Sequence, residues 1–147
     1  MSLKGRALKY LAAREHSRAE LARKLTPHAE SSEQLVQLLD ELEQKGWLSA
    51  QRFAESVVHR KGARYGVARL RSELRQHQLP VDVASAAIQA LQDSEFQRAH
   101  ELWSRRFGAP PHSPQEKARQ MRFLLGRGFE SDVVHRVIRG DGLATEE

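Results

Sequence analysis

The sequence contains no cysteine and no asparagine, and only 6% of its residues are aromatic. Without cysteine the protein forms no disulfide bond and no thiolate zinc site, so a reducing compartment costs it nothing. Long hydrophobic runs are also missing: none approaches the roughly 20 residues of a membrane span, and residues 1–17 lack the apolar core of a signal peptide. We therefore expect a soluble, cytoplasmic protein that is not exported.

Patterns typical of β-strands are missing as well, because Val, Ile, Thr and aromatic residues never alternate with polar ones for long. Helix starts are indicated by serines in an S-x-x-E/Q capping box at Ser17, Ser31, Ser94 and Ser113. Pro114 then occupies the first helical position, where its missing N–H group is harmless. We predict nine helices, over about residues 3–15, 18–26, 32–45, 50–63, 66–77, 80–92, 94–107, 114–126 and 130–139.

The nine predicted helices divide into three sets of three, which indicates a tandem repeat. Two series of aliphatic residues recur at intervals of 49 or 50 positions, namely Leu25, Leu74 and Leu124, and Leu39, Ile88 and Ile138. We expect an all-α fold of three tandem three-helix repeats that form an elongated, curved protein. The predicted repeats are residues 1–48, 49–93 and 94–140, with a disordered tail at 141–147 and the Pro-rich stretch 108–114 joining two helices of the third repeat.

Motifs of catalysis and of metal binding are not found. The seven histidines show no H-x3-H or HExxH spacing, and the chain has no phosphate-binding P-loop and no G-x-S-x-G elbow. His16, His77 and His112 lie at predicted helix ends or in a loop, where surface or capping roles are expected. The acidic group at residues 40–43 flanks leucines and is interpreted as a solvated helix face. We expect no enzymatic activity, no cofactor and no metal.

Positive charge is concentrated in the second and third repeats of a chain with 24 Lys+Arg against 19 Asp+Glu. The segment GARYGVARLRSELRQHQL, residues 62–79, has four arginines and a single carboxylate, Glu73. With 3.6 residues per turn, Val67, Leu70 and Leu74 form a buried stripe together with His77, and the arginines lie on a neighbouring flank. The predicted binding surface for a polyanion or an acidic protein consists of Arg60, Lys61, Arg64, Arg69, Arg71, Arg75, Arg105, Arg106, Lys117, Arg119, Arg122 and Arg127.

Three stretches of the chain resemble the RecX family of recombination regulators. They are REHSRAELARKL at 14–25, GWLSAQRFAES and YGVARLRSELRQHQL within 46–79, and RFGAPPHSPQEKARQMRFLLGRGF at 106–129. The sequence departs from the usual family pattern at Ser49 and Ala50, which replace two acidic residues, and at His77 and Gln78, which replace Lys-Gly.

The resemblance implies a non-enzymatic protein that binds filaments of the RecA recombinase on single-stranded DNA and lies in their helical groove. Such a protein restrains strand exchange, ATP hydrolysis and coprotease activity, and so acts in homologous recombination, DNA repair and the SOS response. We also expect a monomer with weak, salt-sensitive binding to single- and double-stranded DNA.

Two other classes of protein remain open from the residues alone. A helix-turn-helix regulator would also be basic and helical, but it needs a recognition helix with base-reading side chains and is usually a two-fold dimer. Neither feature is evident in the sequence. A helical-repeat adaptor for some other protein is the second alternative, and failure to bind a RecA filament would favour it.

Overall fold

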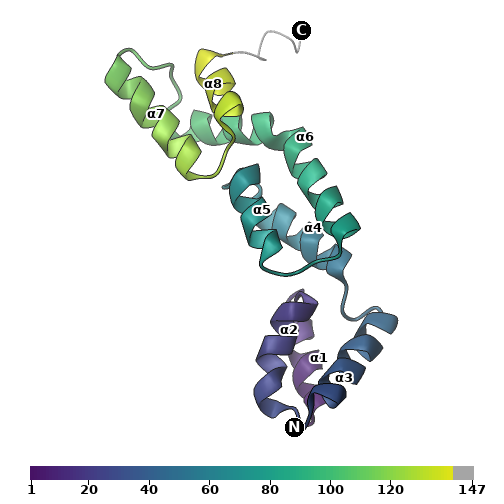
Figure 1. The fold of residues 1–147 in the computed structure, drawn as a ribbon. Coiled ribbons are helices and arrows are strands. Elements are labelled where there is room, and N and C mark those ends of the chain that lie inside the picture. The colour runs from purple at the N-terminus through teal and green to yellow at the C-terminus, as the bar shows by residue number, and fades with distance from the viewer. Residues whose placement is uncertain (141–147) are drawn as a thin grey trace. The chain divides into compact units, whose positions relative to one another are not determined.

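The computed structural model describes residues 1–140, and all regular structure within them is helical (Figure 1). The elements in chain order are α1 (Leu3–Ala13), α2 (Arg18–Leu25), the short 3-10 helix η1 (Thr26–His28), α3 (Ser32–Gln44), α4 (Ala50–Lys61), α5 (Val67–Arg75), α6 (Val81–Arg106), α7 (Pro114–Gly126) and α8 (Ser131–Arg139). The all-α prediction is confirmed for this part of the chain. The predicted tail at 141–147 lies outside the described residues.

The prediction of two helices at 80–92 and 94–107 is wrong, since α6 runs unbroken through both ranges. Ser94 does not cap a helix: its Oγ donates to the carbonyl of Ala90, one turn earlier, at 3.2 Å. No glycine or proline separates the two predicted segments, so nothing interrupts the backbone hydrogen bonds. Residues 1–140 therefore contain eight α-helices, and the second and third sets of three share α6.

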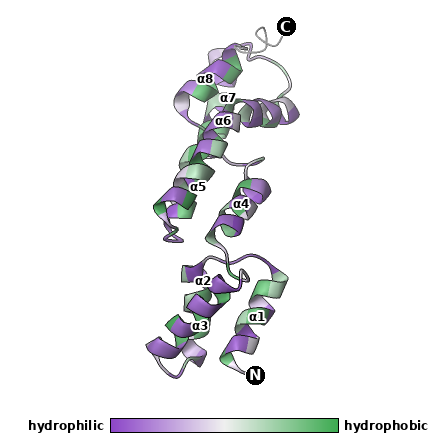
Figure 2. Ribbon diagram, turned by 90° about the vertical axis from the view of Figure 1, so that its right-hand side faces the viewer, coloured by the Kyte–Doolittle hydropathy of each residue, from purple (hydrophilic) through white to green (hydrophobic). Residues whose placement is uncertain are grey.

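The other three predicted capping serines are confirmed. Ser17, Ser31 and Ser113 each accept the backbone N–H of the residue three positions later through the side-chain oxygen. The helices that they begin carry both hydrophobic and hydrophilic residues (Figure 2). No helix among residues 1–140 combines the length and the apolar character needed to cross a membrane.

The chain forms two compact units, and unit 1 comprises residues 1–56 and 74–84. Its hydrophobic core lies among α1, α2 and α3, which gather together in Figure 1. Leucines supply almost all of this core: Leu21, Leu25, Leu35, Leu38, Leu39, Leu42 and Leu48, with Ala7. Phe53 and Leu74 are also buried in unit 1, each with 2% of its surface exposed.

Unit 2 comprises residues 57–73 and the chain from residue 85 onward. Its main core forms where α7 and α8 pack beside the C-terminal part of α6 (Figure 1). The buried members are Ala99, Leu102, Trp103, Leu124, Phe129, Val133, Val134, Val137 and Ile138. Gln120 accepts the indole N–H of Trp103 at 2.8 Å, so this buried polar pair is satisfied.

The 49–50 residue periodicity predicted five of six core positions: Leu25, Leu74 and Leu124 are buried, as are Leu39 and Ile138, whereas Ile88 is only partly buried. The stretch 108–114 joins α6 to α7, as predicted. The exact repeat boundaries at residues 48 and 93, and the elongated, curved shape, stay predictions.

A candidate binding surface of arginines and aromatic rings

The predicted basic residues lie almost entirely in unit 2, where aromatic rings bring five of the twelve together. Only Arg75 belongs to unit 1. Lys61, Arg71 and Arg127 are partly buried, and the other members of the predicted surface are exposed.

Tyr65 is the ring around which the basic residues of two repeats meet. The guanidinium carbon of Arg69 lies 3.9 Å from the ring centroid, and that of Arg64 lies 5.6 Å away. Arg127 approaches the same ring from the end of α7, at 5.8 Å. Arginines that are about 60 positions apart in sequence thus contact the same aromatic side chain.

Two phenylalanines extend this arrangement. Arg127 also lies 5.1 Å from the Phe123 ring, and Arg106 lies 5.0 Å from it. Phe107 meets Phe123 edge to face at 5.5 Å, and Arg119 lies 5.9 Å from Phe107. We call these residues the arginine–aromatic array: Arg64, Arg69, Arg106, Arg119 and Arg127 with Tyr65, Phe107 and Phe123.

The arginines of the array have no carboxylate partner among residues 1–140, whereas two other predicted members of the surface do. Lys61 is hydrogen-bonded to Glu73, and Arg71 lies 3.8 Å from Glu130. Within residues 1–140, none of the five array arginines forms an ion pair with a carboxylate. A guanidinium that lies against a ring presents its five N–H donors in one plane, which suits bidentate contact with phosphate or carboxylate.

Two glycines allow the backbone that follows Tyr65 to lie against the backbone at the end of α7. Gly66 donates its N–H to the Arg127 carbonyl at 2.9 Å, and Ala68 donates to the Gly128 carbonyl at 3.0 Å. A Cβ at Gly66 would lie 2.4 Å from the backbone N and Cα of Phe129, and one at Gly128 would lie 2.4 Å from the Cβ of Arg69. Gly128 also has a φ of +90°, which disfavours other residues. We call this pair of hydrogen bonds the glycine contact.

Two residues of α6 hold the same region, and the sequence did not single them out. Glu95 is 4% exposed, and its carboxylate accepts the N–H groups of Val67 at 3.0 Å and Glu130 at 3.2 Å. Burial raises the pKa of Glu95, although both hydrogen bonds oppose the rise. Arg98 donates to the carbonyls of Gly62 and Tyr65. The sequence did offer one signal: Gly66 precedes α5 and has no side chain that could cap the helix, so an acceptor for its first N–H groups had to come from elsewhere in the fold.

The charges of unit 1 are largely neutralised by local pairs. Arg18 bonds Asp40 at 2.8 Å and Glu43 at 3.1 Å, and Arg14 bonds Glu20. The acidic group at 40–43 is thus an ion-paired face and not merely a solvated one. Unit 1 therefore offers no group of unpaired arginines comparable with the array.

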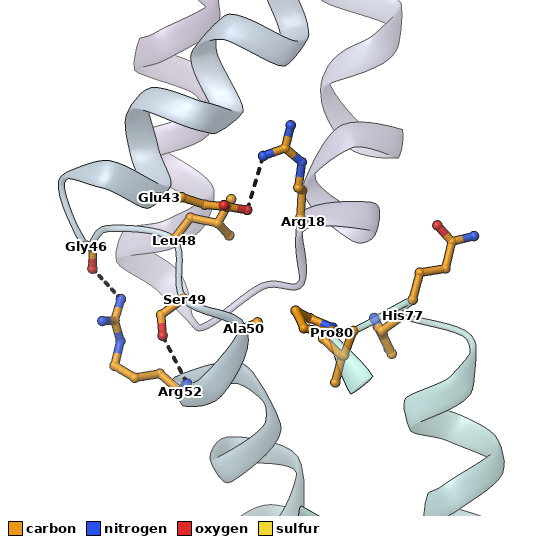
Figure 3. A pocket seen from close by; sticks show the side chains of 11 residues that line it. Arg18, Glu43, Gly46, Leu48, Ser49, Ala50, Arg52, His77 and Pro80 are labelled. Atoms are coloured by element: carbon orange, nitrogen blue, oxygen red, sulfur yellow. Dashed lines mark hydrogen bonds and ion pairs between the residues drawn. The ribbon is translucent and has the colours of Figure 1, made fainter. Parts of the chain in front are cut away.

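A cavity in unit 1 is a second candidate site (Figure 3). It encloses about 520 Å³ beside the start of α4, and Arg18 and Arg52 line it. Both cations are engaged: Arg18 with Glu43, and Arg52 with the Gly46 carbonyl at 2.7 Å. Ser49, one of the two departures from the usual acidic pair, accepts the Arg52 N–H at 3.2 Å and so caps α4. The polar groups that line the cavity are therefore engaged in contacts that stabilise the fold.

Two histidines have structural roles in unit 1. His16 was expected in a surface or capping role, but only 1% of it is exposed, and it contacts the Arg14 carbonyl at 3.1 Å and the Lys24 ammonium at 2.8 Å. Burial lowers the pKa of His16, which favours the neutral ring. His77 contacts the Ser17 hydroxyl at 2.7 Å and packs on Phe53. Within residues 1–140, no group of three or more His, Cys, Asp or Glu side chains could hold a metal ion.

Three family models match the chain in order. They describe the first, second and third three-helix domains of RecX, and they match residues 4–33, 51–88 and 93–138. Among curated proteins, the regulatory protein RecX of Leptothrix cholodnii is 58% identical over 139 residues, which are 95% of this chain and 88% of the relative. The regulatory protein RecX of Ralstonia nicotianae is 56% identical over 140 residues, with the same two shares.

Solved structures support the same fold. The crystal structure of RecX from Lactobacillus salivarius matches with a TM-score of 0.77 at 18% identity. The match covers 94% of this chain and 93% of that chain. A second crystal structure of a regulatory protein RecX has a TM-score of 0.74 at 20% identity, and the match covers 92% of this chain and 70% of that chain.

Proposed function

The chain belongs to the RecX family of regulatory proteins, and on that basis we propose that it is a non-enzymatic regulator of the RecA recombinase. It binds RecA filaments on single-stranded DNA and mainly inhibits the recombinase, ATPase and coprotease activities of RecA. It acts as a cytoplasmic monomer in homologous recombination, DNA repair and the SOS response.

The arginine–aromatic array is the observation that supports this function most directly. A RecA filament on DNA offers phosphates and acidic protein side chains, and both are acceptors for the in-plane N–H donors of arginine. The array presents five guanidinium groups without carboxylate partners among residues 1–140. The three rings restrict the arginine side chains before binding, which reduces the entropy that binding must offset.

The structure also ranks the twelve predicted surface residues. Lys61 and Arg71 already have carboxylate partners, so an approaching anion would compete with Glu73 and Glu130. We therefore propose that the array makes the principal contacts with the filament and that Lys61 and Arg71 contribute little.

The ATPase of RecA in the presence of single-stranded DNA tests the function. Titration with this protein should lower the rate of hydrolysis at substoichiometric to equimolar amounts. If hydrolysis is unchanged even at an equimolar ratio, the proposed function is wrong.

A pair of double variants tests the role of the array at equal loss of charge. Arg69→Gln with Arg127→Gln removes two unpaired cations, whereas Lys61→Gln with Arg71→Gln removes two paired ones. The first should weaken inhibition at least about tenfold, because hydrogen bonds to charged groups contribute about 1.5–3 kcal/mol each. The second should change it by less than about twofold. Equal effects of the two variants would assign the inhibition to overall charge instead.

A further inference from the structure

Two helices of unit 2 begin without a capping side chain of their own. The residue before α5 is Gly66, which has no side chain, and the residue before α8 is Glu130, whose side chain makes no capping hydrogen bond. By contrast, α2, α3 and α7 each begin with a serine that caps locally. The first N–H groups of a helix need an acceptor, and in a buried position that acceptor must come from elsewhere in the fold.

One carboxylate supplies both caps. The Oε2 atom of Glu95 accepts the N–H of Val67, the first residue of α5, and the N–H of Glu130, the residue before α8. Negative charge is favourable at a helix N-terminus, and here it lies at two N-termini at once. Because Glu95 is 4% exposed, water does not replace these bonds when they are lost.

These two helix starts flank the glycine contact. Val67 lies between Gly66 and Ala68, the two donors of the contact, and Glu130 follows two residues after Gly128, one of its acceptors. Arg98, one turn after Glu95 on α6, fixes the carbonyl of Tyr65. The same face of α6 thus holds the Tyr65 backbone, the start of α5 and the start of α8.

We propose that Glu95 is a positioning residue for the arginine–aromatic array: by capping α5 and α8 together it keeps Arg69 and Arg127 on the same Tyr65 ring. Glu95 itself does not contact the filament. The functional half of this inference rests on the proposed function, whereas the structural half can be tested without RecA.

The structural half is tested by amide hydrogen exchange on the full chain. Glu95→Gln keeps the shape of the side chain but removes its charge, and Glu101→Gln is the matched control, an exposed position on the same helix. Exchange should accelerate in Glu95→Gln at the amides of Gly66, Val67, Ala68 and Glu130, while amides in unit 1 keep their protection. Unchanged exchange at these four amides would overturn the inference.

The functional half is tested by a double-mutant cycle on RecA filament binding. Glu95→Gln should weaken binding about tenfold, which corresponds to about 1.4 kcal/mol, and Glu101→Gln should leave it unchanged. In an Arg69→Gln background the further effect of Glu95→Gln should fall below about twofold, because the array is already broken. A tenfold effect in both backgrounds would show that Glu95 acts through overall stability and would overturn the positioning role.

The outcomes separate the two proposals. If the parent protein does not affect RecA at all, the proposed function fails, and the exchange experiment still decides whether Glu95 holds the glycine contact. If Glu95→Gln does not melt cooperatively, Glu95→Asp replaces it, since the shorter side chain keeps the charge but does not reach both N–H groups. Full protection and full binding in Glu95→Asp would then contradict the need for a double cap.

Discussion

Replacing Gly66 with alanine would place a methyl group inside the glycine contact. The added Cβ would lie 2.4 Å from the backbone N and Cα of Phe129 and 2.5 Å from the carbonyl oxygen of Gly128. All three neighbours are main-chain atoms, so no side chain can rotate away, and the two backbones must separate. The separation stretches the hydrogen bonds from Gly66 to Arg127 and from Ala68 to Gly128.

The size of the effect follows from two terms. Overpacking in a well-packed region costs about 1–3 kcal/mol, and each lost backbone hydrogen bond costs about 0.5–1.5 kcal/mol. We expect Gly66→Ala to lower the free energy of unfolding by about 2–6 kcal/mol if both bonds are lost. Gly126 is the matched control, since a Cβ there meets no atom within 4 Å and the residue is the last of α7.

Urea unfolding followed by circular dichroism measures both variants. Gly126→Ala should leave the unfolding free energy unchanged or raise it by up to about 1 kcal/mol, because alanine is the better helix former. Gly66→Ala should also weaken RecA filament binding, since it moves Arg69 away from Arg127. If Gly66→Ala is as stable as Gly126→Ala, the close backbone approach does not exist in solution and does not hold the array together.

Three further changes test other parts of the fold. Leu74→Ala should destabilise the protein by about 2–5 kcal/mol in urea, because Leu74 is 2% exposed, whereas Arg75→Gln at its exposed neighbour should change stability by less than about 0.5 kcal/mol. Burial raises the pKa of Glu20, but the hydrogen bond and charge of Arg14 outweigh it and lower the pKa to about 2. The stability from this pair is therefore complete above about pH 5 and declines toward pH 2, so Arg14→Gln should melt with less dependence on pH in that window, and parallel curves would contradict the pairing. Truncation after Asp93 cuts α6 and removes the cap of α5, so its thermal melt should lose cooperativity; a sharp, reversible melt at the full-length midpoint would show that α7 and α8 form an independent domain.

Capping serines show how far local sequence determines helix boundaries. Ser17 and Ser113 were recognised from the sequence because a capping hydrogen bond spans only three residues. Ser94 has the same pattern, yet its hydroxyl bonds a carbonyl of the preceding turn and the helix continues. Both geometries are open to a serine locally, so the choice depends on packing around α6, where Leu91 and Glu95 are both buried in unit 2.

The basic residues also show what local sequence determines and what packing decides. The sequence indicated that basic residues gather at 60–75 and 105–127, and these ranges do contain all five arginines of the array. It did not distinguish Arg71, which has a carboxylate neighbour in Glu130, from Arg69, which lies on Tyr65. The two arginines are two positions apart on one helix. Arg69 contacts Tyr65, four residues earlier, whereas the carboxylate beside Arg71 comes from the start of α8, so only the tertiary structure decides that Arg71 is paired.

The sequence alone determined the all-helical class and the spacing of the buried leucines, because helical periodicity and capping act over a few residues. It also determined the membership of the chain in its family, through the motifs that it carries. The glycine contact, the double cap from Glu95 and the shared position of Arg69 and Arg127 were decided only by the tertiary structure. Each of these contacts joins residues about 30 to 60 positions apart. The free energy of such contacts comes from burial and from hydrogen bonds shielded from water, which exist only after the helices have packed.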